Sequence, residues 1–182
     1  SEQMLYYSRY ANRIGVDELS FDVGLRSWIY DLGYKGDVKW GNLKGGLEVV
    51  RHEFQPQKIS LEGEFANDIP AQPTQSSVES SAYALYRQPL AANLSCELGL
   101  RASLYHHQTR YYGLSPNFKL LWNPTSQSKL SLHVGIHRQY LFQTGFSSSG
   151  LPSEFWFSAD SLRRPQYSYN ASLQGEFWLF GK

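Results

Sequence analysis

The sequence predicts an all-β protein, an antiparallel up-and-down transmembrane β-barrel of about eight strands that forms part of a larger barrel. Three observations predict this class: apolar and polar residues alternate with a period of two, connections sort into short turns and long loops, and aromatic residues gather near strand ends. Successive side chains of a strand point to opposite faces, so such alternation gives one apolar and one polar face. No comparable stretch shows the 3.6-residue period of an amphipathic helix.

The alternation is clearest in 94–104, where even positions are apolar or small and odd positions include charged residues. It recurs in three further segments, 130–137, 169–179 and 19–25. After Ser27 the phase slips by one residue and the apolar positions continue through 28–40, which predicts a β-bulge. On a barrel, four charged residues of the polar face would line the lumen: Asp22, Arg26, Glu97 and Arg101.

Eight strands follow from this pattern, at roughly 3–14, 18–40, 42–54, 77–88, 92–107, 110–123, 128–142 and 165–181. The whole of 1–182 then forms a single barrel segment with no plug domain. Turn-like residues make the connections short at one end, at 41–42, 89–92 and 123–127. At the other end two connections are long, 55–76 and 143–164, whereas the one near Gln108 is short. Bacterial outer-membrane barrels sort their connections in this way.

Aromatic residues make up 15% of the chain. One group lies near the short-turn ends of the strands: Trp40, Tyr86, Trp122 and Trp178. Another lies near the opposite ends: Tyr105, Tyr111, Tyr112, Tyr140, Phe142 and Tyr167. Two such belts are typical of the girdles at the two membrane interfaces. The alternative is that these side chains fill the core of a soluble sheet.

Composition excludes several other classes. The 17 basic and 16 acidic residues are interspersed, with no basic run suited to a nucleic-acid backbone. No apolar run approaches the roughly 20 residues of a membrane-spanning helix, whereas a mean hydropathy of −0.45 is compatible with a barrel. The single cysteine, Cys96, rules out an internal disulfide and fits a small apolar position.

Signatures of catalysis and metal binding are missing. His133 and His137 share a strand face but lie about 13 Å apart at 3.3 Å per residue, too far for one metal ion. No Gly-x-Ser-x-Gly elbow is present. Gly45, Gly46 and Gly99 fit strand positions that need close packing or curvature. We therefore expect no catalytic residue, no metal and no cofactor, and a protein that is not an enzyme.

Several segments in order resemble the TonB-dependent outer-membrane receptors of Gram-negative bacteria. They are LEVVRHEFQP at 47–56, YALYR at 83–87, LGLRASLY at 98–105, LSPNFKL at 114–120, QYL at 139–141, LPSEFW at 151–156 and RPQ at 164–166. Ser115 and Asn117 stand where the family commonly has a charged pair. Barrels of this family close about 22 strands around a plug, so the resemblance implies a central piece of the wall.

The resemblance implies energy-coupled nutrient uptake across the outer membrane. The implied partners are outer-membrane lipid, the remaining barrel, a plug domain, a small substrate, and a TonB-type coupling protein that acts on a region outside this chain. No nucleic acid is expected. Substrate contacts would come from the long loops, with three candidates: Phe155, Trp156 and Arg164. Trp156 has an alternative role as an anchor packed on the barrel rim.

Two alternatives stay open. A self-contained eight-stranded barrel with a structural or adhesive role is an allowed closed form, and the aromatic spacing of 175–180 resembles a barrel-assembly signal. A lipid-modifying barrel enzyme would use Ser131 and His133, although no acidic residue at a recognisable spacing would orient the histidine.

Overall fold

The fold is given by a computed structural model that describes residues 1–18, 21–62, 73–146 and 153–178. Within these ranges, residues 12–18, 21–26, 56–62, 144–146 and 153–155 are described by their backbone only. The chain is all-β: the described residues contain no helix, and hence none that is long and apolar enough to cross a membrane.

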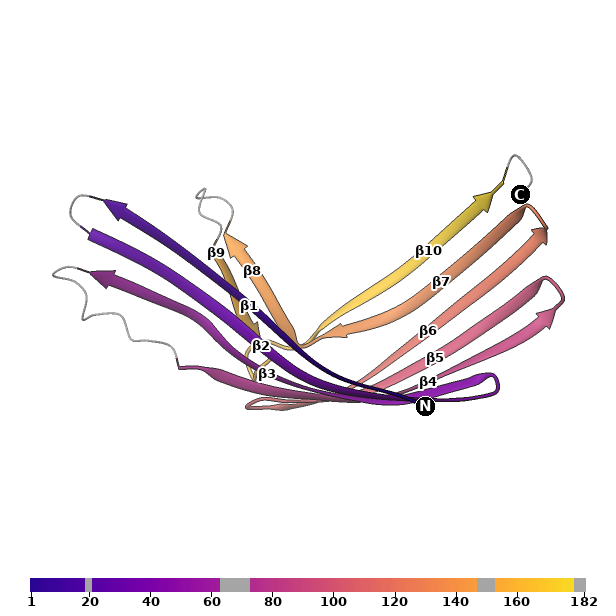
Figure 1. The fold of residues 1–182 in the computed structure, drawn as a ribbon, viewed down its shortest axis with the longest axis horizontal. Helices are drawn as coiled ribbons and strands as arrows, with labels where there is room; N and C mark the ends of the chain where they lie inside the picture. Colours follow the sequence, from indigo (N-terminus) through magenta and orange to yellow (C-terminus); the bar gives the residue numbers. More distant parts are fainter. Residues whose placement is uncertain (19–20, 63–72, 147–152, 179–182) are drawn as a thin grey trace.

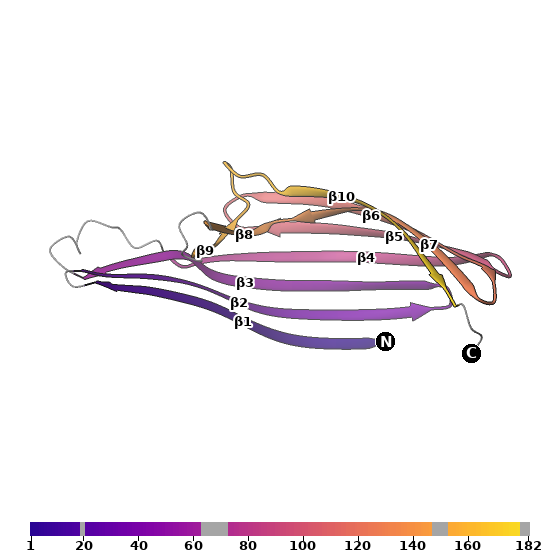
Figure 2. The ribbon, with the colours of Figure 1, turned by 90° about the horizontal axis from the view of Figure 1, so that it is seen from above.

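Eight strands form one antiparallel sheet, with spatial order β1-β2-β3-β4-β5-β6-β7-β10 (Figures 1 and 2). They are β1 (Glu2–Glu18), β2 (Phe21–Trp40), β3 (Leu43–Glu62), β4 (Gln75–Ala91), β5 (Leu94–His106), β6 (Arg110–Thr125), β7 (Ser128–Gln139) and β10 (Gln166–Phe177). β8 (Leu141–Phe146) and β9 (Ser153–Ser158) form a separate antiparallel hairpin. The predicted up-and-down antiparallel order is therefore confirmed, but the described sheet is not closed, because β1 and β10 do not pair.

Tight turns join the strands at one end of the sheet, which we call the turn end; the opposite end is the loop end. The turns lie at 41–42, 92–93 and 126–127. Gly41 has a φ of 57°, a left-handed conformation that glycine adopts without steric cost. In β2, the register against β3 shifts between Arg26 and Trp28, which confirms the predicted bulge.

The predicted loops at 55–76 and 143–164 were too long. β3 continues to Glu62, since the alternation around Ile59 extends the strand beyond Pro56. The second segment contains most of hairpin β8–β9, and the predicted strand 128–142 is interrupted at Tyr140. In both places Pro, Ser and Gln in the composition concealed short stretches of alternating apolar residues.

The hairpin lies over one face of the sheet, near β2 and β3 (Figures 1 and 2). We call this the inner face and the opposite one the outer face. The register places apolar residues opposite one another on the outer face, for example Leu98 with Phe118 and Leu132 with Leu173. Leu98 is 52% exposed and Leu173 is 78% exposed. The outer face is thus an apolar surface that nothing in the described chain covers.

Candidate functional site: the polar inner face

Ion pairs and hydrogen bonds cross the middle of the inner face. Glu48 of β3 accepts hydrogen bonds from Tyr6 Oη at 3.3 Å and from Arg101 Nη2 at 2.7 Å. Arg101 also lies 3.8 Å from Glu79. Strand order puts Tyr6 and Glu48 on either side of β2, and Glu48 and Arg101 on either side of β4. The side chains therefore lie across the strands and tie β1 to β5.

A second cluster centres on Asp37 of β2. Its carboxylate accepts a hydrogen bond from Tyr83 of β4 and pairs with Lys44 at 2.9 Å. A third cluster joins Asp31 to His52 at 2.7 Å and to Ser8 at 3.2 Å. Because each of these carboxylates has a donor from another strand of the sheet, adjacent or next but one, the charged groups of this face largely compensate one another.

Glycines make room for these crossing side chains. A Cβ on Gly33 would lie 2.1 Å from Tyr6 Cζ, and one on Gly46 would lie 2.6 Å from both Asp37 Oδ1 and Tyr83 Oη. These distances are too short for real carbon atoms. The expectation that Gly46 occupies a closely packed strand position is confirmed.

Hairpin β8–β9 is fixed to the inner face by aromatic and hydroxyl groups. The rings of Tyr105 and Tyr140 stack at 4.9 Å with an interplanar angle of 4°. Tyr105 Oη lies 2.8 Å from Ser158 Oγ, and Tyr140 Oη lies 2.7 Å from Ser103 Oγ. With Phe142 and Ala159, these tyrosines form the buried apolar cluster of the described chain.

This cluster corrects part of the predicted aromatic belt. Tyr105, Tyr140 and Phe142 are 0%, 2% and 5% exposed. They are buried where the sheet meets the hairpin, of which Phe142 is itself a residue, and do not lie on the exposed surface of the sheet. The prediction was wrong because it used only their position along the strands and ignored which face they occupy. Tyr111 is partly buried and packs against the same cluster, whereas Tyr112 and Tyr167 remain 72% and 51% exposed. At the turn end the four predicted aromatics are all exposed, with Trp40 at 83%.

The predicted lumen-facing residues Glu97 and Arg101 both lie on the inner face in ion pairs. Glu97 pairs with Arg87 at 3.1 Å, near the turn end. The side chains of Asp22 and Arg26, predicted for the same face, lie outside the described residues. Sequence reasoning missed Glu48 and Glu79, the partners of Arg101, although the alternation around Glu48 could have indicated its face.

The three residues predicted to contact a substrate lie in two different segments of the chain, β9 and the connection before β10. Trp156 of β9 is half-buried and meets Tyr10 of β1 edge-on, with ring centroids 6.0 Å apart. This contact agrees with the anchoring role. Phe155 lies in β9 and its side chain is outside the described residues, whereas Arg164 is exposed in the segment before β10. The structure does not bring Trp156 and Arg164 into a described contact.

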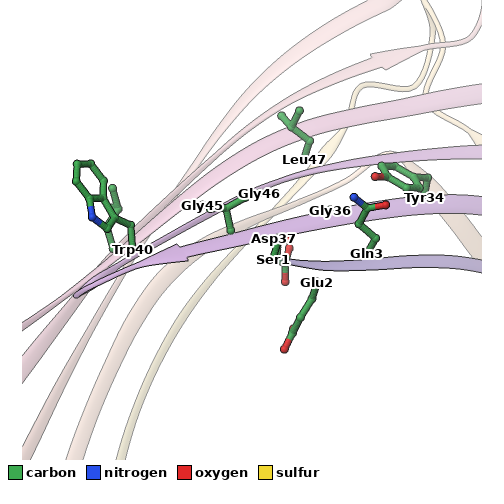
Figure 3. A pocket seen from close by; sticks show the side chains of 12 residues that line it. Ser1, Glu2, Gln3, Tyr34, Gly36, Asp37, Trp40, Gly45, Gly46 and Leu47 are labelled. Carbon is green, nitrogen blue, oxygen red and sulfur yellow. The ribbon is translucent and has the colours of Figure 1, made fainter.

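The outer face has an apolar hollow of about 540 Å³ at the turn end (Figure 3). Tyr34, Trp40 and Leu47 border it, with Gly36 and Gly45 between them. The hollow arises where the two glycines leave a gap among large apolar side chains, so it continues the apolar outer face.

Among the described residues, no group of three His, Cys, Asp or Glu side chains could hold a metal ion. No protein-family model, curated protein or solved structure matches the chain. The features of the chain that bear on its function are therefore the exposed apolar side chains of the outer face and the paired charges of the inner face.

Proposed function

We propose that this chain is a section of the wall of an outer-membrane β-barrel, a TonB-dependent receptor that takes up a small nutrient with energy coupling. The observation that carries the proposal is the distribution of side chains between the two faces. Leucines such as Leu100, 48% exposed, cover the outer face, whereas Glu48 and Arg101 pair on the inner one. A sheet with water on its outer side would expose the charges and cover the leucines.

Strand length and the free edges support a wall. The sheet strands run from 12 residues in β7 and β10 to 20 residues in β2 and β3, and roughly 9–11 tilted residues cross a bilayer. Unpaired backbone groups at the edges of β1 and β10 cannot stay unsatisfied in lipid. Further strands at both edges would satisfy them, which favours a partial barrel over closure of these eight strands alone.

The uptake role rests on the resemblance to the receptor family together with the inner face. In a barrel, an inner face lined by paired polar groups would let a hydrated solute pass. The hairpin, packed on that face, would narrow the lumen. In this mechanism the surface segments bind the substrate, and a plug elsewhere in the protein moves when the coupling protein acts on it.

The wall is tested by arginine substitutions on opposite faces. Leu132→Arg or Leu100→Arg should block assembly, because a cation at mid-bilayer on the lipid face costs about 2–4 kcal/mol. Ser131→Arg, one residue away on the inner face, is the matched control and should assemble. The measurement is the amount of folded, protease-resistant full-length protein in purified outer membranes. Normal assembly of both leucine variants would contradict the lipid-facing assignment.

Energy coupling is tested separately in cells that make the full-length protein. Labelled iron chelates, vitamins, oligosaccharides and peptides are supplied with and without an uncoupler of the proton-motive force. Accumulation that the uncoupler abolishes supports the receptor. Accumulation that it leaves unchanged would identify a passive pore with the same wall.

A further inference from the structure

The sheet splits between β6 and β7 towards the loop end. Their pairing runs from the turn at Thr125 and Ser128 as far as Asn117 with Gly135, and no described pair continues it. Yet β6 begins as early as Arg110 and β7 ends at Gln139. Backbone groups along this split must find other partners, because strand carbonyl and amide groups are costly to leave unpaired.

Arg138 bridges the split. Its Nη1 donates a hydrogen bond of 3.0 Å to the carbonyl oxygen of Tyr112 on β6, and its guanidinium carbon lies 4.5 Å from the ring centroid of Tyr167 on β10. Its Nε is buried without a hydrogen-bond partner in the described part of the chain. No described carboxylate forms an ion pair with it, in contrast to Arg101.

A small polar pocket of about 240 Å³ opens at this place. It is lined by seven polar side chains: Glu79, Arg101, Ser103, Ser115, His137, Arg138 and Tyr140. Two guanidinium groups face one carboxylate, and Arg101 is already paired with Glu48 and Glu79. The charge of Arg138 is therefore the one left without a counter-charge among these residues.

We propose that this pocket binds the carboxylate or phosphate group of a small solute in the lumen, with Arg138 as the principal contact. An arginine fork matches the geometry of these oxyanions, and an anion would supply the missing acceptor for a partly buried cation. Ser115 and His137 provide further donors. A pocket below the roughly 300 Å³ of ordinary ligand sites takes one anionic group, not a whole large molecule. The inference deepens the proposed function, on which its lumenal setting rests.

The test is calorimetric titration of the full-length protein, folded in a detergent with a neutral headgroup, with inorganic phosphate and separately with acetate. Saturable binding of at least one anion is expected. Arg138→Gln should weaken anion binding at least tenfold. Arg110 is an exposed arginine at the loop end of β6, and Arg110→Gln should leave the affinity unchanged. Equal weakening by both variants, or no saturable binding of either anion, would overturn the proposal.

Two further arms keep the result specific. Because Arg138 also binds the carbonyl of Tyr112, its loss could disturb the split, so Ser115→Ala provides a second variant, expected to weaken binding a few-fold. An unchanged affinity in this variant would count against the pocket. Phosphatidylglycerol added to the micelles should not compete with phosphate; competition would mean that a lipid headgroup, and not a solute, occupies the site.

Failure of this proposal and failure of the proposed function give different results. If the protein assembles in outer membranes but binds neither anion, the proposed barrel wall stands and the proposed anion site is wrong. If the protein binds phosphate through Arg138 but the Leu132→Arg variant assembles normally, the anion site stands and the proposed barrel wall is wrong.

Discussion

Neighbouring residues on β5 experience opposite surroundings. Leu100 is 48% exposed on the outer face, while Arg101 beside it is held between Glu48 and Glu79 on the inner face. In a water-soluble sheet the same alternation would bury the leucine and expose the arginine. The alternation thus defines two faces, and only the packing of the hairpin shows which of them the chain itself covers.

The two faces also differ in how they use glycine. Gly46 on the inner face lies beneath crossing side chains, whereas a Cβ on its neighbour Gly45 would find only the carbonyl oxygen of Tyr83, at 3.5 Å. On the inner face, the space left by the missing side chain is therefore filled by groups of the polar network. On the outer face it leaves part of a surface hollow (Figure 3).

The largest expected effect comes from adding one methyl group to each of these glycines. In Gly46→Ala the new carbon would meet Asp37 Oδ1 at 2.6 Å and the carbonyl oxygen of Gly36 at 2.7 Å, so overpacking should cost about 1–3 kcal/mol. Gly45→Ala should be neutral or slightly stabilising, because it only restricts the unfolded chain. The measurement is urea unfolding of the full-length protein in lipid vesicles. Equal free energies of unfolding for the two variants would contradict the claim that the inner face is more tightly packed than the outer face.

Much of the sheet was predictable because strand alternation is local. The order of the strands, the turn at Gly41 and the bulge after Ser27 each follow from a few consecutive residues. The partners of Arg101 did not follow, because the contact with Glu48 depends on the register of three successive strands. The hairpin was missed for a related reason: its strands are only six residues long and are stabilised by contacts with distant residues such as Tyr105.

A second pair of variants, between which a smaller difference in stability is expected, tests whether the inner network is uniform. Arg101→Leu removes the cation shared by Glu48 and Glu79, and uncompensated carboxylates at half-buried positions should cost about 1–3 kcal/mol. Arg87→Leu removes the partner of Glu97 near the turn end, where the arginine side chain is 58% exposed, and should cost about 0–1 kcal/mol. Both are measured by the same urea titration. A loss at Arg87 as large as that at Arg101 would show that position along the strand makes no difference.

The smallest effect concerns the segment that leads from the hairpin to β10. Asp160 accepts hydrogen bonds from the backbone amides of Leu162 and Arg163 and pairs with the Arg163 guanidinium at 2.6 Å. Its hydrogen bonds to Arg163 hold the pKa of the Asp160 carboxyl below its ordinary value of 3.8. This lowered pKa stabilises the turn above pH 3.8, and the contribution is lost as the pH falls through the pKa of the folded protein.

Amide hydrogen exchange at Leu162 and Arg163, corrected for intrinsic rates, measures this contribution. Protection should stay constant from about pH 7 to 5 and fall only below about pH 4, by an amount corresponding to no more than about 1 kcal/mol. Asp160→Asn, which cannot ionise, should show lower protection with no such step. The inner network carries its charges on strands, whereas this turn carries its charges on a connection. A step confined to the turn would therefore show that Asp160 stabilises the connection independently of the inner network. Loss of protection that begins above pH 5 would instead assign the step to a group other than Asp160.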